Sequence, residues 1–231
     1  MYPYCFLLLF ILGSSAASGQ KLAGEAEILL LSRHIWRGNQ LGDAIAVEPS
    51  VTISGGRFSF NLWAARTTNN SYSEIDLIPS YQFNHFSLTL LDYYNPVPGE
   101  INQYLNFQEG KNRHSVEMNI DNYSIDKQRF KWMAGTFILG DKNEKTGKPF
   151  YSTYLEFKYP FTVFEIETKP FAGLTPFKGY YADKFAIINI GISFSKEIDL
   201  KLPFTFPLSL SFISNPYSKQ SFVIFAGGIA F

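Results

Sequence analysis

The stretch that decides the fold class is Glu74-Ile75-Asp76-Leu77-Ile78-Pro79-Ser80-Tyr81-Gln82-Phe83. Apolar residues occupy every second position from Ile75 to Phe83. The alternate positions hold Glu74, Asp76, Ile78, Ser80 and Gln82, all of them polar except Ile78. Because successive side chains of a strand point to opposite faces, this pattern predicts a β-strand with one apolar and one polar face.

The same alternation recurs along the rest of the chain, and no stretch after the first 20 residues shows a helical stripe. We count about 12 such segments, each close to the 9–11 residues that a membrane-spanning strand needs. They predict an all-β fold, a single antiparallel up-and-down transmembrane β-barrel. The predicted strands are Ala26–Arg37, Ile45–Ser54, Arg57–Thr67, Glu74–Phe83, Phe86–Asn95, His114–Asp121, Phe130–Gly140, Tyr151–Tyr159, Val163–Leu174, Phe185–Ser195, Phe204–Ser214 and Ser221–Phe231.

The links between these strands alternate in length. The short ones are predicted turns at Gly55-Gly56, Asn84-His85 and Tyr159-Pro160-Phe161. The long ones are polar, as loops on one side of an outer-membrane barrel are. They are Gly38–Ala44, Thr68–Ser73, Pro96–Arg113, Asp141–Phe150, Thr175–Lys184 and Asn215–Gln220. Two links on the other side, Asn122–Arg129 and Lys196–Pro203, are longer than this rule predicts.

The N-terminus is uncharged over its first 20 residues, and the apolar run Phe6–Leu12 precedes a group of small residues. This pattern predicts a signal peptide over residues 1–19, cleaved after Ala17 or Gly19, and a barrel domain over residues 20–231. Cys5 precedes the apolar run, so a lipoprotein anchor is not expected. The prediction is export to the outer membrane of a Gram-negative cell.

The composition excludes two other classes of protein. Of the 231 residues, 20 Lys+Arg balance 20 Asp+Glu, so the basic excess of a nucleic-acid-binding protein is absent and no nucleic-acid partner is expected. A hydrophobic content of 46% is too high for a disordered chain.

The last segment, Phe222–Phe231, alternates and ends on an aromatic carboxyl terminus. It resembles the C-terminal signal that the outer-membrane barrel assembly machinery recognises, so we expect that machinery as a partner through Phe231. A barrel in lipid must pair every strand edge, which places Ala26–Arg37 beside Ser221–Phe231. Aromatic residues near strand ends predict girdles at the lipid headgroups: Trp36, Trp63, Tyr81, Phe83, Tyr93, Tyr94, Trp132, Tyr151, Tyr159, Phe161 and Phe171.

The stretch Ser32-Arg33-His34-Ile35-Trp36-Arg37-Gly38 resembles the S-x-x-x-[aromatic]-R-G opening of the Gcw_chp family of small bacterial outer-membrane barrels. The resemblance continues to about Ile120 and covers roughly the first half of the mature chain. Its further matches are Val47–Ser50, Gly55-Gly56, Asn61–Ala64, Glu74–Leu77 and Leu91–Pro96. It implies an outer-membrane barrel of porin-like character, and it supplies neither a substrate nor catalytic residues.

One pattern suggests an alternative, enzymatic function. His85 and Ser87 are two residues apart, so they lie on one strand face as a base and a nucleophile must, with Glu100 or Asn95 to orient the histidine. Such a pair would suit an esterase that modifies outer-membrane lipid, but the predicted topology puts it at a periplasmic turn, away from the lipid at the cell surface. His34 and His114 fall on different strands without metal-ligand spacing, and nucleotide-binding and metalloprotease motifs are absent. No enzymatic activity and no cofactor are therefore expected.

The polar faces of the predicted strands form the inner wall, together with two arginines of the first strand. The pore-lining candidates are Arg33, Arg37, Glu74, Asp76, Glu117, Glu156, Lys158, Glu165, Glu167 and Lys169. Such a wall suits either a water-filled pore or a network of paired charges that closes the barrel. We expect a small passive channel for hydrophilic solutes or ions, surrounded by outer-membrane lipid. The alternatives are the lipid-modifying esterase, a closed barrel with an anchoring or surface-interaction role through Pro96–Arg113, and a soluble lipocalin-like protein.

Overall fold

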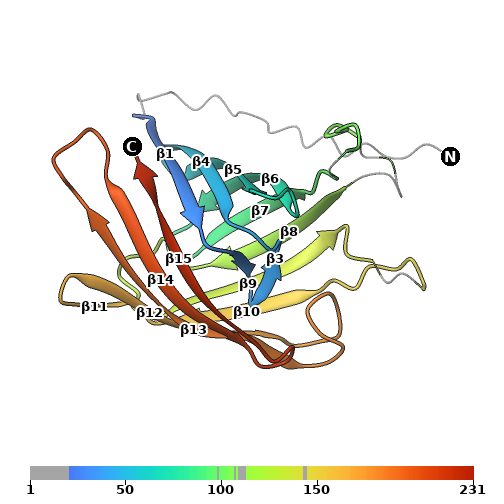
Figure 1. Ribbon diagram of the computed structural model, residues 1–231. Helices are drawn as coiled ribbons and strands as arrows, with labels where there is room; N and C mark the ends of the chain where they lie inside the picture. Colours follow the sequence, from blue (N-terminus) through green and yellow to red (C-terminus); the bar gives the residue numbers. More distant parts are fainter. Residues whose placement is uncertain (1–20, 98, 107, 109–112, 143–144) are drawn as a thin grey trace.

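The computed structural model describes residues 21–97, 99–106, 108, 113–142 and 145–231. The predicted signal peptide, residues 1–19, lies outside the described residues. The described chain forms a barrel of antiparallel strands and a two-stranded hairpin (Figure 1). The barrel strands are β1 Ala23–Leu31, β4 Ala46–Gly55, β5 Phe58–Thr67, β6 Ser73–Gln82, β7 Ser87–Tyr94, β8 His114–Asp121, β9 Lys131–Leu139, β10 Thr153–Lys158, β11 Phe161–Val163, β12 Ile166–Thr175, β13 Ala186–Ile198, β14 Phe206–Asn215 and β15 Gln220–Ala230.

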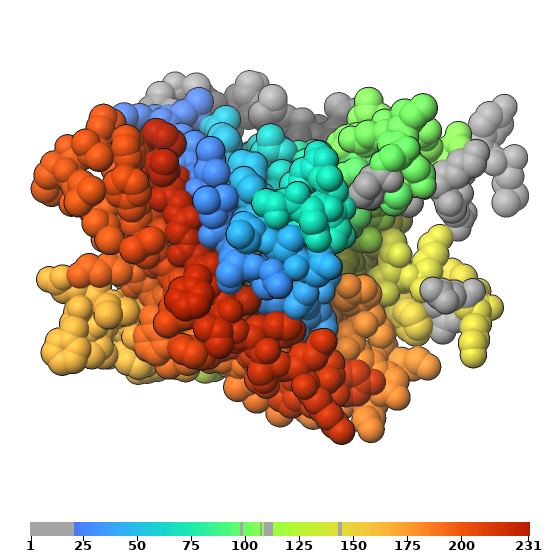
Figure 2. All heavy atoms as spheres, viewed as in Figure 1, coloured from blue at the N-terminus to red at the C-terminus, as the bar shows by residue number. Residues whose placement is uncertain are grey.

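The barrel closes at two places. Strand β10 pairs with β12, and β1 pairs with β15 from Glu27↔Ala230 to Leu31↔Ala226. In Figure 2 the N-terminal and C-terminal strands lie side by side on one face. Strand β11 keeps the register of β10 against β12, so the two are one strand with a short gap. The result is a closed 12-strand antiparallel barrel, as the sequence predicts.

The first predicted strand is wrong at its end. Strand β1 stops at Leu31, and the chain then turns away from the wall. It forms the hairpin of β2, His34–Trp36, and β3, Asn39–Leu41. The other predicted strands coincide with observed ones, with small differences at their ends.

The predicted corner at Tyr159-Pro160-Phe161 is also wrong. Tyr159 N–H donates to the Pro170 carbonyl at 3.1 Å, and the ladder resumes at Phe161↔Thr168. Proline lacks an N–H, so it leaves a gap in the ladder without bending the chain. The turn comes at Phe164 and Glu165 instead, where φ is 48° and 62°.

The two faces of the wall have opposite character. The outward residues are apolar and well exposed, among them Ile28, Leu30, Val51, Ile53, Leu62, Met118, Ile190, Phe212, Val223 and Phe225. The inward residues are mostly polar. This arrangement is the one that a membrane barrel requires and is opposite to that of a soluble lipocalin-like barrel, because water-soluble proteins rarely expose an apolar surface of this extent. Among the described residues, no helix is long and apolar enough to cross a membrane.

The links divide between two ends of the barrel. We call one the loop end: it carries the links 32–45, 68–72, 95–113, 140–152, 176–185 and 216–219. We call the other the turn end: it carries the first and last barrel residues and the links 56–57, 83–86, 122–130, 164–165 and 199–205. Longer links on one side and mostly short turns on the other match the predicted alternation.

Candidate functional site in the barrel lumen

The hairpin of β2 and β3, residues 34–41, folds into the barrel lumen, and we call it the lumen hairpin. Trp36 pairs with Asn39 across a two-residue turn made by Arg37 and Gly38, where φ is 50° and 78°. Two successive positive φ values define the tight turn in which glycine is favoured at the second position. The Arg37-Gly38 pair therefore sets the hairpin tip, and Gly38 lies against β13 and β14.

Arg37 is held by a buried ion pair. Its Nη2 lies 2.8 Å from Glu117 Oε1 on β8, and its Nη1 donates to Oε2 at 3.0 Å. Both side chains are almost inaccessible, at 7% and 0% exposure. The Tyr181 hydroxyl also accepts from Arg37, and the guanidinium carbon lies 4.6 Å from the Trp36 ring centroid. A buried charge is stable only when it is paired in this way, so Glu117 fixes the hairpin tip.

Trp36 packs in the centre of an aromatic cluster inside the lumen. Its ring centroid lies 5.8 Å from that of Tyr93, 6.3 Å from Phe137, 6.0 Å from Tyr180 and 5.7 Å from Tyr181. The prediction that Trp36 and Tyr93 belong to a membrane girdle is therefore wrong. Edge-to-face contacts of this kind stabilise the packed hairpin beyond the area it buries.

The other side of the hairpin is anchored as well. His34 Nδ1 lies 2.6 Å from Glu48 Oε1 on β4, and the His34 ring lies between Trp63 and Tyr72, with centroid separations of 5.6 and 5.4 Å. Trp63, also predicted for a girdle, thus points inward.

At the tip, Asn215 on β14 donates to the Gly38 carbonyl at 3.2 Å. Position 38 has no space for a side chain, because a Cβ there would lie 2.0 Å from the carbonyl oxygen of Ile188 on β13. Since the hairpin contacts residues from β4 round to β14, it spans the lumen.

Glu156 organises a second network, nearer the turn end. It accepts from the hydroxyls of Tyr154 and Tyr123 at 2.7 Å each, and Lys158 Nζ lies 2.8 Å from it. Tyr123 comes from the turn-end link 122–130, which thus also reaches into the lumen. Asn189 donates to Glu156 from β13 at 3.2 Å.

Most predicted pore-lining residues do face the lumen. Glu74 and Asp76 follow each other on the inner face of β6, and Glu117, Glu156 and Lys158 belong to the networks above. Glu167 and Lys169 form a 2.8 Å ion pair on β12. Glu167 and Lys169 lie apart from the residues around the hairpin.

Two of the predicted pore-lining residues are placed differently. Glu165 lies at the turn between β11 and β12, where it is exposed and pairs with Lys196 at 3.0 Å, so it belongs to the turn-end rim and not to the inner wall. Arg33 lies in the link after β1 and donates to the Ser32 carbonyl at 3.1 Å. Arg37 reaches the lumen, but from the hairpin and not from a wall strand.

Space remains at both ends of the lumen. At the loop end, a cavity of about 410 Å³ lies between the lumen hairpin and β6 to β9. At the turn end, a cavity of about 680 Å³ is lined by residues that include Glu25, Glu27 and Thr52, and a neighbouring one of about 420 Å³ by Glu27, Glu167 and Ser209. The lumen is thus hollow at its two ends and filled across its middle.

The residues of the enzymatic alternative do not come together. His85 is exposed in the turn between β6 and β7, and Ser87 Oγ lies 2.8 Å from Ser124 Oγ at the turn end. The proposed orienting groups lie at the loop end, where Asn95 donates to Glu74 and Glu100 pairs with Arg113.

His114 is the partner of Tyr94 in the ladder and so faces outward, under the link 95–113. It lies 2.8 Å from Asp92 and 2.6 Å from the Tyr104 carbonyl oxygen. Burial and Asp92 raise the pKa of the Tyr104 hydroxyl to about 12. In the described part of the chain, no group of three or more side chains is arranged to hold a metal ion.

Comparisons with known proteins identify the fold of the chain but not its family. No family profile and no curated protein sequence matches the chain, so the resemblance to the Gcw_chp family stays a prediction. Among solved structures the chain is similar to a KdgM porin, with a TM-score of 0.51 and 8% identity over 90% of this chain and 98% of that one. It is also matched to OmpF of Salmonella typhi, solved as a complex with daunomycin, with a TM-score of 0.34 and 9% identity over 92% of this chain and 98% of that one. The chain therefore has the closed barrel fold of a porin, and its own hairpin fills the middle of the lumen.

Proposed function

We propose that the chain is a porin-like outer-membrane channel for small hydrophilic solutes or ions, closed in this conformation by the lumen hairpin. The observation that carries the proposal is the closed ring of paired strands, apolar outside and polar inside. In hydrocarbon, unpaired backbone groups cost several kcal/mol each, so a strand structure in lipid has to be closed. A soluble role does not require an apolar exterior.

The orientation follows from the links. Outer-membrane barrels place long loops outside the cell and short turns in the periplasm. The loop end, with the lumen hairpin beneath it, then faces the outside. The predicted signal peptide, residues 1–19, would deliver the chain to the periplasm for assembly.

The expected pore is narrow. A barrel of this strand number encloses less space than the 16–18-stranded general porins. The lumen hairpin narrows it further, and the charges that line it are mostly paired. We therefore expect passive conduction of small solutes, controlled by the position of the hairpin.

A planar lipid bilayer tests the proposal. In the variant, a short Gly-Ser linker replaces residues 34–41 of the refolded protein; in the control, the same linker replaces residues 216–219, a loop-end link that lies outside the lumen. We expect small or rare current steps from the wild type and the control, and larger, stable steps from the hairpin variant. The absence of current from all three proteins contradicts the channel.

The same experiment tests a second function. The paired charges and buried rings of the lumen favour a permanently closed barrel with an anchoring or surface-interaction role through the link 95–113. Under that function, removing the hairpin produces no conductance of a defined size. A salt gradient across the bilayer would then detect no ion preference.

The C-terminal residue is proposed to guide assembly. Phe231 exchanges backbone hydrogen bonds with Ala26, at 2.8 and 3.4 Å, and its ring lies 5.8 Å from that of Phe204. Deleting Phe231 removes the end of the closing ladder and the aromatic group offered to the assembly machinery. We expect much less heat-modifiable, folded barrel in the outer-membrane fraction. Phe231→Tyr keeps both features and should assemble normally. Normal insertion of the deletion variant would argue against the signal.

A further inference from the structure

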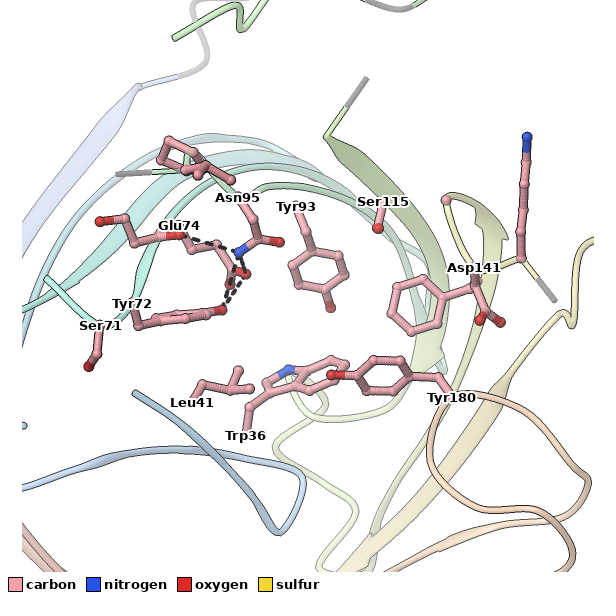
Figure 3. Close-up of a pocket in the computed structure, with 16 residues that line it drawn as sticks. Trp36, Leu41, Ser71, Tyr72, Glu74, Tyr93, Asn95, Ser115, Asp141 and Tyr180 are labelled. Carbon is pink, nitrogen blue, oxygen red and sulfur yellow. Dashed lines mark hydrogen bonds between the residues drawn. The ribbon is translucent and has the colours of Figure 1, made fainter. Parts of the chain in front are cut away.

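The loop-end cavity is a ring-lined chamber above the lumen hairpin, which we call the vestibule (Figure 3). Its volume of about 410 Å³ falls within the range of small-molecule sites. If the chain is the channel proposed above, the vestibule is its outer mouth.

Aromatic side chains from separate parts of the chain line the vestibule. Trp36 comes from the lumen hairpin and Tyr180 from the link 176–185, and in Figure 3 they lie along one side of the chamber with Tyr93 opposite. Tyr72 and Phe137 complete the set. Aromatic faces carry partial negative charge, which attracts cations and disfavours anions.

Two carboxylates lie on different sides of these rings, Glu74 beside Tyr72 and Asp141 beside Tyr180 (Figure 3). Glu74 Oε2 accepts from the Tyr72 hydroxyl at 2.5 Å and from Asn95 at 2.6 Å. Asp141 Oδ2 accepts from the Ser152 N–H at 2.9 Å. Lys142 also lines the chamber, so its described wall holds one more carboxylate than ammonium.

The electrostatic field at Tyr180 agrees with this count. Burial, and then the negative charges of Glu74 and Asp141, raise the pKa of the Tyr180 hydroxyl. Burial disfavours the ionised phenol most, and the two carboxylates disfavour it further because ionisation would add another negative charge to the chamber. The two carboxylates favour a cation in the same space, whereas burial disfavours a charge of either sign.

We propose that the vestibule binds a small organic cation of the quaternary or alkylated ammonium class. Its methyl groups would contact the rings of Trp36 and Tyr180, and Asp141 and Glu74 would balance its charge. Such ligands have no N–H to donate or only a few, so they need aromatic faces and nearby carboxylates and do not need a dense hydrogen-bonding network. Only one part of the inference rests on the proposed function, namely that the bound cation is a solute of the channel.

Calorimetric titration of the refolded protein in detergent tests the inference. The probe is choline, compared with 3,3-dimethylbutan-1-ol, its uncharged isostere of the same shape, and with glucose. We expect choline to bind more tightly than either. Asp141→Asn keeps the size of the side chain and an acceptor for Ser152, and Tyr180→Ala removes a ring. Each should weaken choline binding by about tenfold.

Matched controls lie at the same end of the barrel. Asp183 accepts from the Tyr217 hydroxyl at 2.8 Å, outside the vestibule. Asp183→Asn and Tyr217→Ala should therefore leave choline binding unchanged. Heat-modifiable gel mobility verifies that every variant is folded, and Asp141→Asn remains decisive if Tyr180→Ala fails to fold.

Three results would overturn the inference: equal binding of the neutral isostere, tighter binding of glucose, or loss of binding in the control variants. Absence of choline binding to the folded wild type would do the same. Because binding in detergent requires no current, this inference and the channel fail separately. Choline binding without conductance would indicate a barrel that binds the cation but is not a channel. Conductance without choline binding would indicate a channel without this selectivity.

Discussion

A valine at position 38 is expected to expel the lumen hairpin while the barrel wall stays closed. Gly38 has φ of 78°, which a β-branched residue adopts only with strain. A Cβ there would also lie 2.0 Å from the Ile188 carbonyl oxygen and 3.1 Å from its carbon. Because both are backbone atoms of β13, they cannot move aside without breaking the ladder. The hairpin, which is attached to the wall only through its side chains and tip, is the part that moves.

Trypsin detects this movement. The bond after Arg37 is buried in the wild type and should resist cleavage, whereas in Gly38→Val it should be cut quickly, and the same protein should conduct in a bilayer. Gly147→Val is the matched control, because Gly147 has φ of 66° and a Cβ there would meet no atom within 4 Å. Gly147→Val introduces the backbone strain without the clash, so the bond after Arg37 should stay resistant to trypsin in this variant. A Gly38→Val protein that is cut after Arg37 but does not conduct would show that the hairpin does not close the lumen, and one that stays resistant would show that the clash does not expel the hairpin.

The second large effect is expected from Glu117→Leu, which leaves the Arg37 guanidinium buried without its carboxylate. Removing one partner of a buried ion pair costs about 3–5 kcal/mol, which corresponds to a shift of roughly 10²- to 10⁴-fold in a two-state equilibrium. The hairpin can move out of the lumen into water, where the Arg37 guanidinium is solvated. We therefore expect this free-energy cost to displace the hairpin and not to unfold the barrel wall. Bilayer open probability and the rate of cleavage after Arg37 should both rise.

A double substitution separates the ion pair from general damage to the lumen. Arg37→Met with Glu117→Leu replaces both charges by apolar groups of similar size, a change that often preserves or increases stability. We expect the double variant to be closed again. Glu167→Leu is the control, because Glu167 pairs with Lys169 at a partly exposed site, where such pairs contribute little. A double variant as open as Glu117→Leu would mean that the unpaired charge of Arg37 is not what expels the hairpin.

The wall of the barrel is predictable from the sequence for a simple reason. In a barrel with lipid outside and a polar lumen, each strand has to alternate apolar and polar residues along its whole length. The period of two therefore locates almost every strand and indicates which of its faces points to the lipid. Closure between the first and last strands follows from the cost of unpaired edges in lipid, and the structure has it between β1 and β15.

The lumen hairpin is not predictable from the same pattern. The residues after Leu31 continue a mixture of apolar and polar positions, so periodicity gives no sign that the chain leaves the wall. The Arg37-Gly38 pair is the local signal of a tight turn, but the alternation alone places it at the end of a strand. The partners that draw the hairpin inward, Glu117 and Tyr181, lie far away in the chain.

Two further errors have local causes. The girdle prediction fails for Trp36 and Tyr93 because composition near strand ends does not distinguish a ring at the headgroups from a ring in a filled lumen. The turn prediction fails at Pro160 because proline often marks a turn, whereas here it lies in a gap of the ladder. The turn uses Phe164 and Glu165, which carry no turn preference of their own.

The position of the lumen hairpin also determines the order of folding. The tip contacts side chains 80 and 144 residues further along the chain, from β8 and from the link 176–185. These groups are brought to one place only when the ring of strands is complete, and contacts between distant residues form slowly. We therefore expect hairpin insertion to be the last event of refolding, later than the step that makes the protein heat-modifiable. The environment of Trp36 should report it as a separate kinetic phase, and a newly assembled barrel should pass briefly through an open form before it seals itself.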